Sequence, residues 1–297
     1  ELGIPISKDH QLPAWARKLP LPMGLSASDK IVAVSPSYAK EIQTAEFGCG
    51  LEDYLQSRNE ALTGIINGID THSWNPAIDQ TLFSNFSLND LDARVNNKHM
   101  LQAGLNLKVE PDTPLLAYIG RMDQQKGVDL IFKALKLCKE KTWQAIILGT
   151  GNQILEDQAK QLEILFPDTV RSIIKFDSKL ARKIYGGADI LIMPSRYEPC
   201  GLAQMIAMRY GCVPIGRAIG GLKDTITDIS ENGKGTGLLF QESSPQALTS
   251  QLVRGINEYY NKTKWRGIQV NGMKKDFSWK SSAMEYAQIY LELLRSN

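Results

Sequence analysis

Two basic residues occupy a glycine-flanked loop that follows an expected β-strand at positions 115–119. Arg121 stands at the strand end, and Lys126 stands at the start of the next expected helix. A cation at a helix N-terminus opposes the helix dipole unless an anion lies there as well. We therefore expect these two cations to hold a phosphate group rather than to form an ordinary pair of solvated surface charges.

A second loop, at 194–202, carries a carboxylate at the end of another expected strand. Its residues read Pro-Ser-Arg-Tyr-Glu-Pro-Cys-Gly-Leu, and a helix is expected over 201–210. Pro199 fixes the entry to that helix, so the backbone N–H groups of Cys200, Gly201 and Leu202 are free to bind an anion or sugar oxygens. Glu198 is expected beside them, where a carboxylate can also serve simply as a stabilising first-turn acid. The helix start would lower the pKa of Cys200, although a small packed side chain is the favoured interpretation of this cysteine.

Two further glycine-containing loops follow expected strands. Gly149-Thr150-Gly151 matches part of the dinucleotide-binding fingerprint, but Ile154 stands where that fingerprint needs its third glycine. The acid that would bind a dinucleotide ribose about 20 residues further on is also missing, because Val170 and Arg171 stand there. A dehydrogenase is therefore disfavoured. The pair at 220–221 permits either close approach of a ligand to the backbone or a tight turn.

Composition excludes several classes of function. The 297 residues carry 34 Lys plus Arg against 32 Asp plus Glu, so the net charge of +2 provides no basic field for nucleic acid. No run of about 18 apolar residues exists to span a membrane. The four cysteines lie far apart without a Cys-x-x-Cys pair, and the three histidines form no His-x-x-x-His pair. Because the strand-end loops also lack Asp-x-Asp, we expect no metal, and Arg121 and Lys126 must neutralise any bound diphosphate.

The elements that must position these loops alternate regularly between strand and helix from about residue 114 to residue 240. Strands are expected at 115–119, 143–148, 173–176, 190–193, 213–215 and 237–240, with helical patterns between them. This order predicts an α/β fold with one doubly wound, Rossmann-like parallel sheet. In such a sheet the ligand lies beyond the carboxyl ends of the strands, where all four loops are expected.

The two ends of the chain are less regular. An isolated strand is expected at 31–34, a short helix at 37–43, and a helix containing His99 and Leu101 in the polar segment 79–109. The first 22 residues have the character of polar, proline-containing chain. A last helix, at 281–294, has an apolar stripe that needs a surface to cover, and the sheet domain does not obviously offer one. The stripe consists of Ala283, Tyr286, Ile289, Tyr290 and Leu293.

Several motifs occur in an order typical of one enzyme family. They lie at 34–42, 47–51, 64–70, 74–76, 120–127, 194–202, 208–211, 220–222 and 276–279. From about residue 30 to the end, this series resembles the bacterial glycogen synthases and plant starch synthases, which are retaining glucosyltransferases of the GT-B fold. Many related transferases have a second Glu eight residues after the first, where this sequence has Ile206. That departure agrees with the glycogen and starch synthases and disfavours the sucrose-synthase-like group.

The resemblance implies roles for individual residues. Arg121 and Lys126 would hold the donor pyrophosphate, and Glu198 would contact the transferred glucose. Phe176 would stack on the nucleotide base, at a position where tyrosine is common, and Asn67 would reach the donor sugar. Backbone donors would come from Cys200, Gly201 and Leu202.

The resemblance also implies a division into domains. Residues 1–66 would be the tail of an N-terminal, acceptor-side domain, and residues 67–277 would be the nucleotide-sugar-binding Rossmann-like domain. Residues 278–297 would form a helix that crosses back to the N-terminal domain. The family's Lys-x-Gly-Gly-Leu loop does not occur in this sequence, so we expect the sequence to begin inside a longer protein.

The implied activity is transfer of glucose from ADP-glucose to the non-reducing end of an α-1,4-glucan, such as glycogen, starch or a maltooligosaccharide, with retention of configuration. The preference for ADP over UDP comes from the family alone, because stacking on Phe176 hardly discriminates between bases. No cofactor, metal, nucleic acid or membrane partner is implied. The bacterial cytoplasm is the favoured compartment, and the plastid is the alternative. The competing expectation is a catalytically incomplete fragment that binds the donor nucleotide, and a transferase for a lipid or small glycoside is less favoured.

Overall fold

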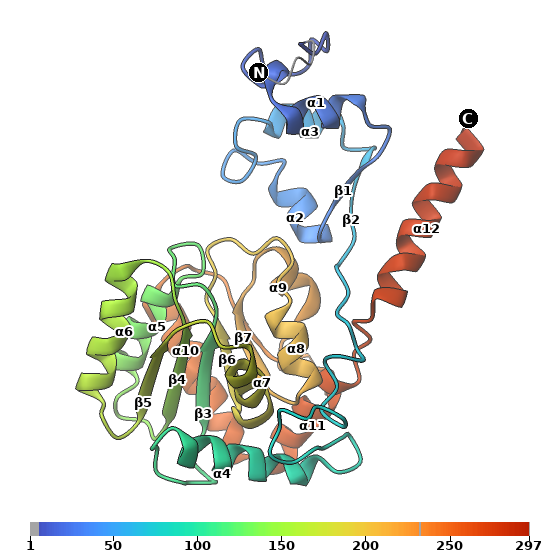
Figure 1. Ribbon diagram of the computed structural model, residues 1–297. Helices are drawn as coiled ribbons and strands as arrows, with labels where there is room; N and C mark the ends of the chain where they lie inside the picture. The colour runs from blue at the N-terminus through green and yellow to red at the C-terminus, as the bar shows by residue number, and fades with distance from the viewer. Residues whose placement is uncertain (1–5, 232, 297) are drawn as a thin grey trace.

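The computed structural model describes residues 6–231 and 233–296 (Figure 1). Within these ranges, six strands form a parallel sheet in the order β5-β4-β3-β6-β7-β8. This order confirms the expected Rossmann-like α/β domain, because it runs outward from β3 to one edge and then from β6 to the other. The strands are β3 (Leu115–Ile119), β4 (Gln144–Gly149), β5 (Val170–Ile174), β6 (Ile190–Met193), β7 (Val213–Arg217) and β8 (Leu238–Phe240).

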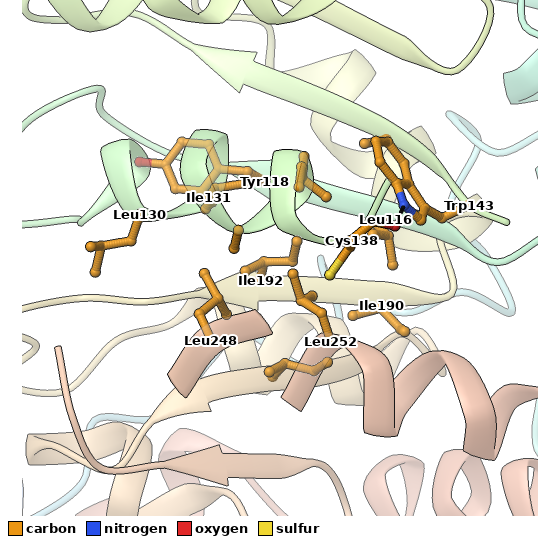
Figure 2. Packing of buried hydrophobic residues seen from close by; sticks show 14 of the residues in the cluster. Leu116, Tyr118, Leu130, Ile131, Cys138, Trp143, Ile190, Ile192, Leu248 and Leu252 are labelled. Atoms are coloured by element: carbon orange, nitrogen blue, oxygen red, sulfur yellow. Dashed lines mark hydrogen bonds between the residues drawn. The ribbon is translucent and has the colours of Figure 1, made fainter. Parts of the chain in front are cut away.

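Helices cover both faces of this sheet. Leu116 and Tyr118 of β3 are buried with α5 (Val128–Leu137), α6 (Gln153–Leu165) and α10 (Pro245–Tyr260). Leu115 and Ala117 are buried on the opposite face, with α4 (Arg94–Gly104), α7 (Ser178–Gly187) and α8 (Ala203–Arg209). Figure 2 shows the first of these two cores, in which side chains of β3, β6, α5 and α10 interdigitate. Burial of each such large apolar side chain stabilises the fold by roughly 1.5–3 kcal/mol.

Three further helical segments complete the described part of the sheet domain. They are η2 (Leu91–Ala93), α9 (Gly220–Thr225) and α11 (Lys262–Met273). The third strand was expected at 173–176, which is wrong by two to three residues, because Val170 is fully buried and Phe176 is 87% exposed. The strand pairs along β4 from Ala145 to Gly149 and ends at Ile174. Polar Arg171 and Ser172 are tolerated inside it because β5 is an edge strand.

The N-terminal segment forms a small unit of its own. It contains η1 (Ala16–Lys18), α1 (Pro20–Ala27), β1 (Ile31–Ala33), α2 (Pro36–Glu41), α3 (Glu52–Ser57) and β2 (Leu62–Gly64). The expectation of an isolated strand near residue 31 is wrong, because β1 pairs in parallel with β2. The polar, proline-containing character of the first 22 residues also gave no indication of η1 or the start of α1. Both misses concern segments of eight residues or fewer, which are too short for a clear periodic pattern.

Two chain segments connect this unit to the sheet domain, and they lie side by side. The Ile69 N–H donates to the Phe277 carbonyl at 2.7 Å, and the Ser282 hydroxyl donates to the Ile66 carbonyl at 2.7 Å. A Cβ on Gly68 would lie 2.4 Å from the Trp279 nitrogen, so only glycine permits this approach. The last helix, α12 (Trp279–Ser296), then rises beside β1 and β2 (Figure 1).

The apolar stripe of α12 is only partly covered in this structure. A groove of about 420 Å³ separates Ile289 on α12 from Leu62 on β2. Tyr286, Ile289 and Leu293 are half-buried, whereas Tyr290 is 63% exposed. The division of the chain at 66/67 and 277/278 remains a prediction. Helix α12, which that division would pair with the N-terminal domain, still presents apolar side chains to solvent.

Candidate active site

The loops after β3 and β6 meet at the point where the strand order reverses. The Arg196 N–H donates to the Gln125 carbonyl at 2.8 Å, and the Gln125 side chain donates to the Tyr197 carbonyl at 3.2 Å. Gly127 has φ of 67°, and a Cβ there would lie 2.3 Å from the Pro194 carbonyl oxygen. These contacts fasten the predicted phosphate loop to the predicted sugar loop at the usual ligand position of a doubly wound sheet.

The centre of this junction is a buried ion pair. Lys126 Nζ lies 2.8 Å from Glu198 Oε1 and 2.7 Å from Oε2. Ser195 donates its hydroxyl proton to Glu198 Oε2 at 2.8 Å. Glu198 is 4% exposed, whereas the Lys126 side chain is 24% exposed and keeps one side open. The structure thus brings two predicted site residues into direct contact and adds Ser195, which sequence reasoning missed.

The fourth loop supports the backbone around Glu198. The Gly221 N–H donates to the Glu198 carbonyl at 3.0 Å. A Cβ on Gly220 would lie 2.0 Å from that carbonyl oxygen, and one on Gly221 would lie 1.9 Å from the Cys200 carbonyl oxygen. The two alternatives for this glycine pair were close approach of a ligand and a tight turn, and the structure shows instead a close approach to the backbone of the Glu198 loop.

The segment from Cys200 to Leu202 precedes helix α8 rather than opening it. The helix begins at Ala203, and Gly201 has φ of 72°. The Gln204 side chain donates to the carbonyls of Cys200 at 3.1 Å and Gly201 at 2.9 Å, which fixes the turn. The expected lowering of the Cys200 pKa is wrong, because burial raises the pKa of this thiol and outweighs a hydrogen bond from the Asn67 backbone. That hydrogen bond also places Asn67 next to Cys200.

An apolar pocket of about 370 Å³ opens beside the carboxyl ends of β3, β4 and β5. Phe176 and Arg121 both line it, and the Arg121 side chain is 68% exposed with its guanidinium 3.0 Å from Asp123. Trp74 and Tyr185 complete the aromatic lining, and sequence reasoning missed them as pocket residues. Trp74 lay within a motif quoted for the family resemblance, which is the signal that pointed to its neighbourhood. Lys126 and Glu198 are not among the lining residues, so the predicted site comprises an open pocket and a separate ion pair on the adjoining loops.

The glycines of the loop after β4 serve packing. A Cβ on Gly149 would lie 1.9 Å from the Gly120 carbonyl oxygen, and one on Gly151 would lie 2.5 Å from the Met122 carbonyl oxygen. The partial dinucleotide fingerprint therefore reflects the close contact between two strand-end loops. Within the described ranges, no group of three or more His, Cys, Asp or Glu side chains is arranged to hold a metal ion. Nor is any helix in those ranges both long and apolar enough to cross a membrane.

A doubly wound parallel sheet with charged loops at its switch point, and with an apolar pocket beside the ends of β3, β4 and β5, agrees with the fold of a GT-B glycosyltransferase. The chain belongs to the glycosyl transferases group 1 family, whose family model matches residues 106–266. A second family model, the starch synthase catalytic domain, matches residues 2–57.

Curated relatives and solved structures agree with this assignment. The chain is 41% identical to a glycogen synthase of Aromatoleum aromaticum, over 98% of this chain and 60% of that protein. It is 40% identical to soluble starch synthase 1, chloroplastic/amyloplastic, of Solanum tuberosum, over 94% of this chain and 46% of that protein. The catalytic domain of starch synthase IV from Arabidopsis thaliana, bound to ADP and acarbose, superposes with a TM-score of 0.84 at 40% identity. That match covers 89% of this chain and 56% of the solved chain, so this chain spans about half the length of its relatives.

Proposed function

We propose that this chain carries the donor site of a glycogen or starch synthase-like glucosyltransferase. The reaction would transfer glucose from ADP-glucose to the non-reducing end of an α-1,4-glucan with retention of configuration. The observation that carries the proposal is the buried Lys126–Glu198 pair, which lies at the sheet's switch point on loops adjoining the pocket of Arg121 and Phe176. The similarity to glycogen and starch synthases supports the choice of this particular glucosyltransferase reaction.

Each proposed role follows from the chemistry of its residue. Arg121 and Lys126 are cations that would stabilise the charge developing on the leaving diphosphate. Glu198, buried and oriented by Lys126 and Ser195, would bind the glucose hydroxyls. Asn67 would reach the sugar, and backbone N–H groups of the turn at 200–202 would serve as further donors. No metal is proposed, because the two cations supply the charge that neutralises the diphosphate.

The alternative function is donor binding without turnover. The chain spans 60% of the Aromatoleum relative and 46% of the Solanum relative, which supports this alternative. We infer that residues 1–66 are the tail of an acceptor-side domain and that residues 67–277 bind the nucleotide sugar. The helix at 278–297 would return to the acceptor-side domain. Incubating the chain with ADP-glucose and glycogen separates the two functions, because glucan elongation by these residues alone would refute the fragment alternative. Calorimetry with ADP and UDP tests the donor assignment, and equal affinity for both would refute the preference for ADP.

Removal of the Phe176 ring is expected to weaken ADP binding without destabilising the fold. Stacking of a base on an aromatic ring contributes about 1–3 kcal/mol, so Phe176→Ala should raise the Kd for ADP about tenfold. Phe176 is 87% exposed, and its truncation should therefore leave the melting temperature unchanged. Phe176→Tyr is the matched control and should retain the affinity of the parent chain. Unchanged ADP affinity in Phe176→Ala would show that the base binds elsewhere.

We also propose the partners and compartment that go with this activity. The donor would be ADP-glucose, and the acceptor would be glycogen, starch or a maltooligosaccharide. The starch synthase IV structure is bound to ADP and acarbose, which supports both halves of this proposal. We propose the bacterial cytoplasm as the compartment and the plastid as the alternative, and the relatives include an example of each: a glycogen synthase of Aromatoleum aromaticum and a chloroplastic or amyloplastic starch synthase.

A further inference from the structure

One face of helix α2, in the N-terminal segment, contacts the residues on both sides of Glu198. The Ser35 hydroxyl donates to the Pro199 carbonyl at 2.6 Å. The Tyr197 hydroxyl donates to the Tyr38 hydroxyl at 2.5 Å, and the two rings meet edge to face at 5.6 Å. The residues immediately before and after Glu198 are therefore both held by a helix more than 150 positions earlier in the chain.

The Ser35 side chain has a fixed environment. It is fully buried, and its oxygen accepts the Tyr38 N–H at 3.2 Å as the N-cap of α2. Its hydroxyl proton is consequently directed at Pro199, while its lone pair caps the helix. A Cβ on Gly64 would lie 2.2 Å from the Ser35 carbonyl oxygen, so β2 closes the other side. The position of α2 therefore directly determines where Ser35 holds the Glu198 loop.

A second line of contact runs through Glu41 on the same helix. Glu41 Oε1 accepts the Gly220 N–H at 2.8 Å, and among the described residues its Oε2 is buried without a hydrogen-bond partner. Burial raises the pKa of Glu41, and the Gly220 hydrogen bond only partly offsets this. Gly220 and Gly221 in turn abut the carbonyls of Glu198 and Cys200. Helix α2 thus reaches the Glu198 loop both directly and through the start of α9.

We propose that Ser35 and Tyr38 are positioning residues for Glu198. They hold the segment 197–199 so that the Glu198 carboxylate stays in register with Lys126 and with the donor sugar. This inference rests on the proposed function, in which Glu198 binds the glucose of the donor. A positioning role can be distinguished from a purely structural one. If Ser35 and Tyr38 served packing alone, their substitution would lower stability without a specific effect on the affinity for glucose.

The test compares the affinities of ADP-glucose and ADP by calorimetry, without acceptor, in the parent chain and in Ser35→Ala. The expected result is an unchanged Kd for ADP and a Kd for ADP-glucose about fivefold higher, from loss of one buried hydrogen bond. Ser35→Thr keeps the hydroxyl and should restore the ADP-glucose affinity. In a Glu198→Gln background, Ser35→Ala should not change the Kd for ADP-glucose further. A residue that acts only by positioning the Glu198 carboxylate has no effect once that carboxylate is absent.

Ser37→Ala is the matched control on the same helix. It removes the 2.6 Å hydrogen bond from the Ser37 hydroxyl to Asp224, which fastens α2 to α9 without touching segment 197–199. Its ADP-glucose affinity should equal that of the parent chain. An equal loss in Ser37→Ala, or an effect of Ser35→Ala that persists beside Glu198→Gln, would overturn the positioning role.

Amide hydrogen exchange gives a readout that needs no ligand. Peptides covering 195–202 should exchange faster in Ser35→Ala, and to a smaller extent in Tyr38→Phe, than in Ser37→Ala. Tyr38→Phe removes a single oxygen and with it the hydrogen bond from Tyr197, so it tests the other contact of α2 with the same segment if Ser35→Ala does not fold. Unchanged exchange in this segment would contradict the proposal even if the parent chain bound neither ADP nor ADP-glucose. That absence of binding would instead refute the proposed function.

Discussion

Replacing Glu198 by Gln in the active protein should lower turnover by at least about 100-fold, as expected for a group that supplies preorganised electrostatic stabilisation. Gln keeps the shape of the side chain and can still accept a hydrogen bond from Ser195 or Lys126 through its amide oxygen. The variant should therefore fold, but its site would carry an uncompensated ammonium in place of a neutral pair. The measurement is the steady-state rate of glucose incorporation from ADP-glucose into glycogen.

A control for this variant is Asp157→Asn on α6, which makes the same acid-to-amide change in an exposed pair with Lys160. Its turnover should stay within about twofold of the parent protein, because exposed pairs contribute little. Near-normal turnover in Glu198→Gln would remove Glu198 from the proposed site. An equal loss of turnover in Asp157→Asn would show that the effect of Glu198→Gln comes from impaired folding.

The second large effect is expected from Lys126→Met. Methionine has a similar length but no charge, so this variant removes a proposed phosphate ligand and leaves the buried Glu198 carboxylate without its cation. ADP affinity should fall about tenfold or more, since a charge-assisted hydrogen bond to phosphate is lost. Stability should fall by about 2 kcal/mol, less than for a fully buried pair because Lys126 is partly exposed. Calorimetry with ADP and denaturant unfolding measure the two effects.

The double variant Lys126→Met/Glu198→Gln distinguishes the two causes. Removal of both charges eliminates the unpaired buried carboxylate, so part of the lost stability should return. ADP affinity should not return, because the phosphate ligand is still missing. Recovery of ADP affinity in the double variant would mean that Lys126 serves only to neutralise Glu198.

Patterns that are local in the chain were predictable. The alternation of apolar runs from β3 to β8 was sufficient to predict the sheet, and the loops of Arg121 and Glu198 could be placed at strand ends from their neighbours. The end of β5 was misjudged because the apolar Phe176 follows Ile173 and Ile174 after only one residue, Lys175, and only burial distinguishes the strand from the exposed ring beyond it.

Contacts between distant parts of the chain were not predictable in the same way. The Lys126–Glu198 pair joins residues 72 positions apart, and the Ser35–Pro199 contact joins residues 164 positions apart. Neither leaves a periodic trace in the sequence. The glycines at 149, 220 and 221 were recognisable as special, but the sequence could not indicate that each accommodates another loop's carbonyl.

The hydrogen bond between Ile69 and Phe277 has a consequence for the modularity of the protein. The chain enters and leaves the sheet domain at adjacent points, with the Ile69 nitrogen 2.7 Å from the Phe277 oxygen. A unit whose two ends meet can be inserted into a loop of another protein, or circularly permuted, without stretching either linker. Residues 69–277 meet this geometric condition, and we expect a swap with the corresponding segment of a relative to keep both junctions in place.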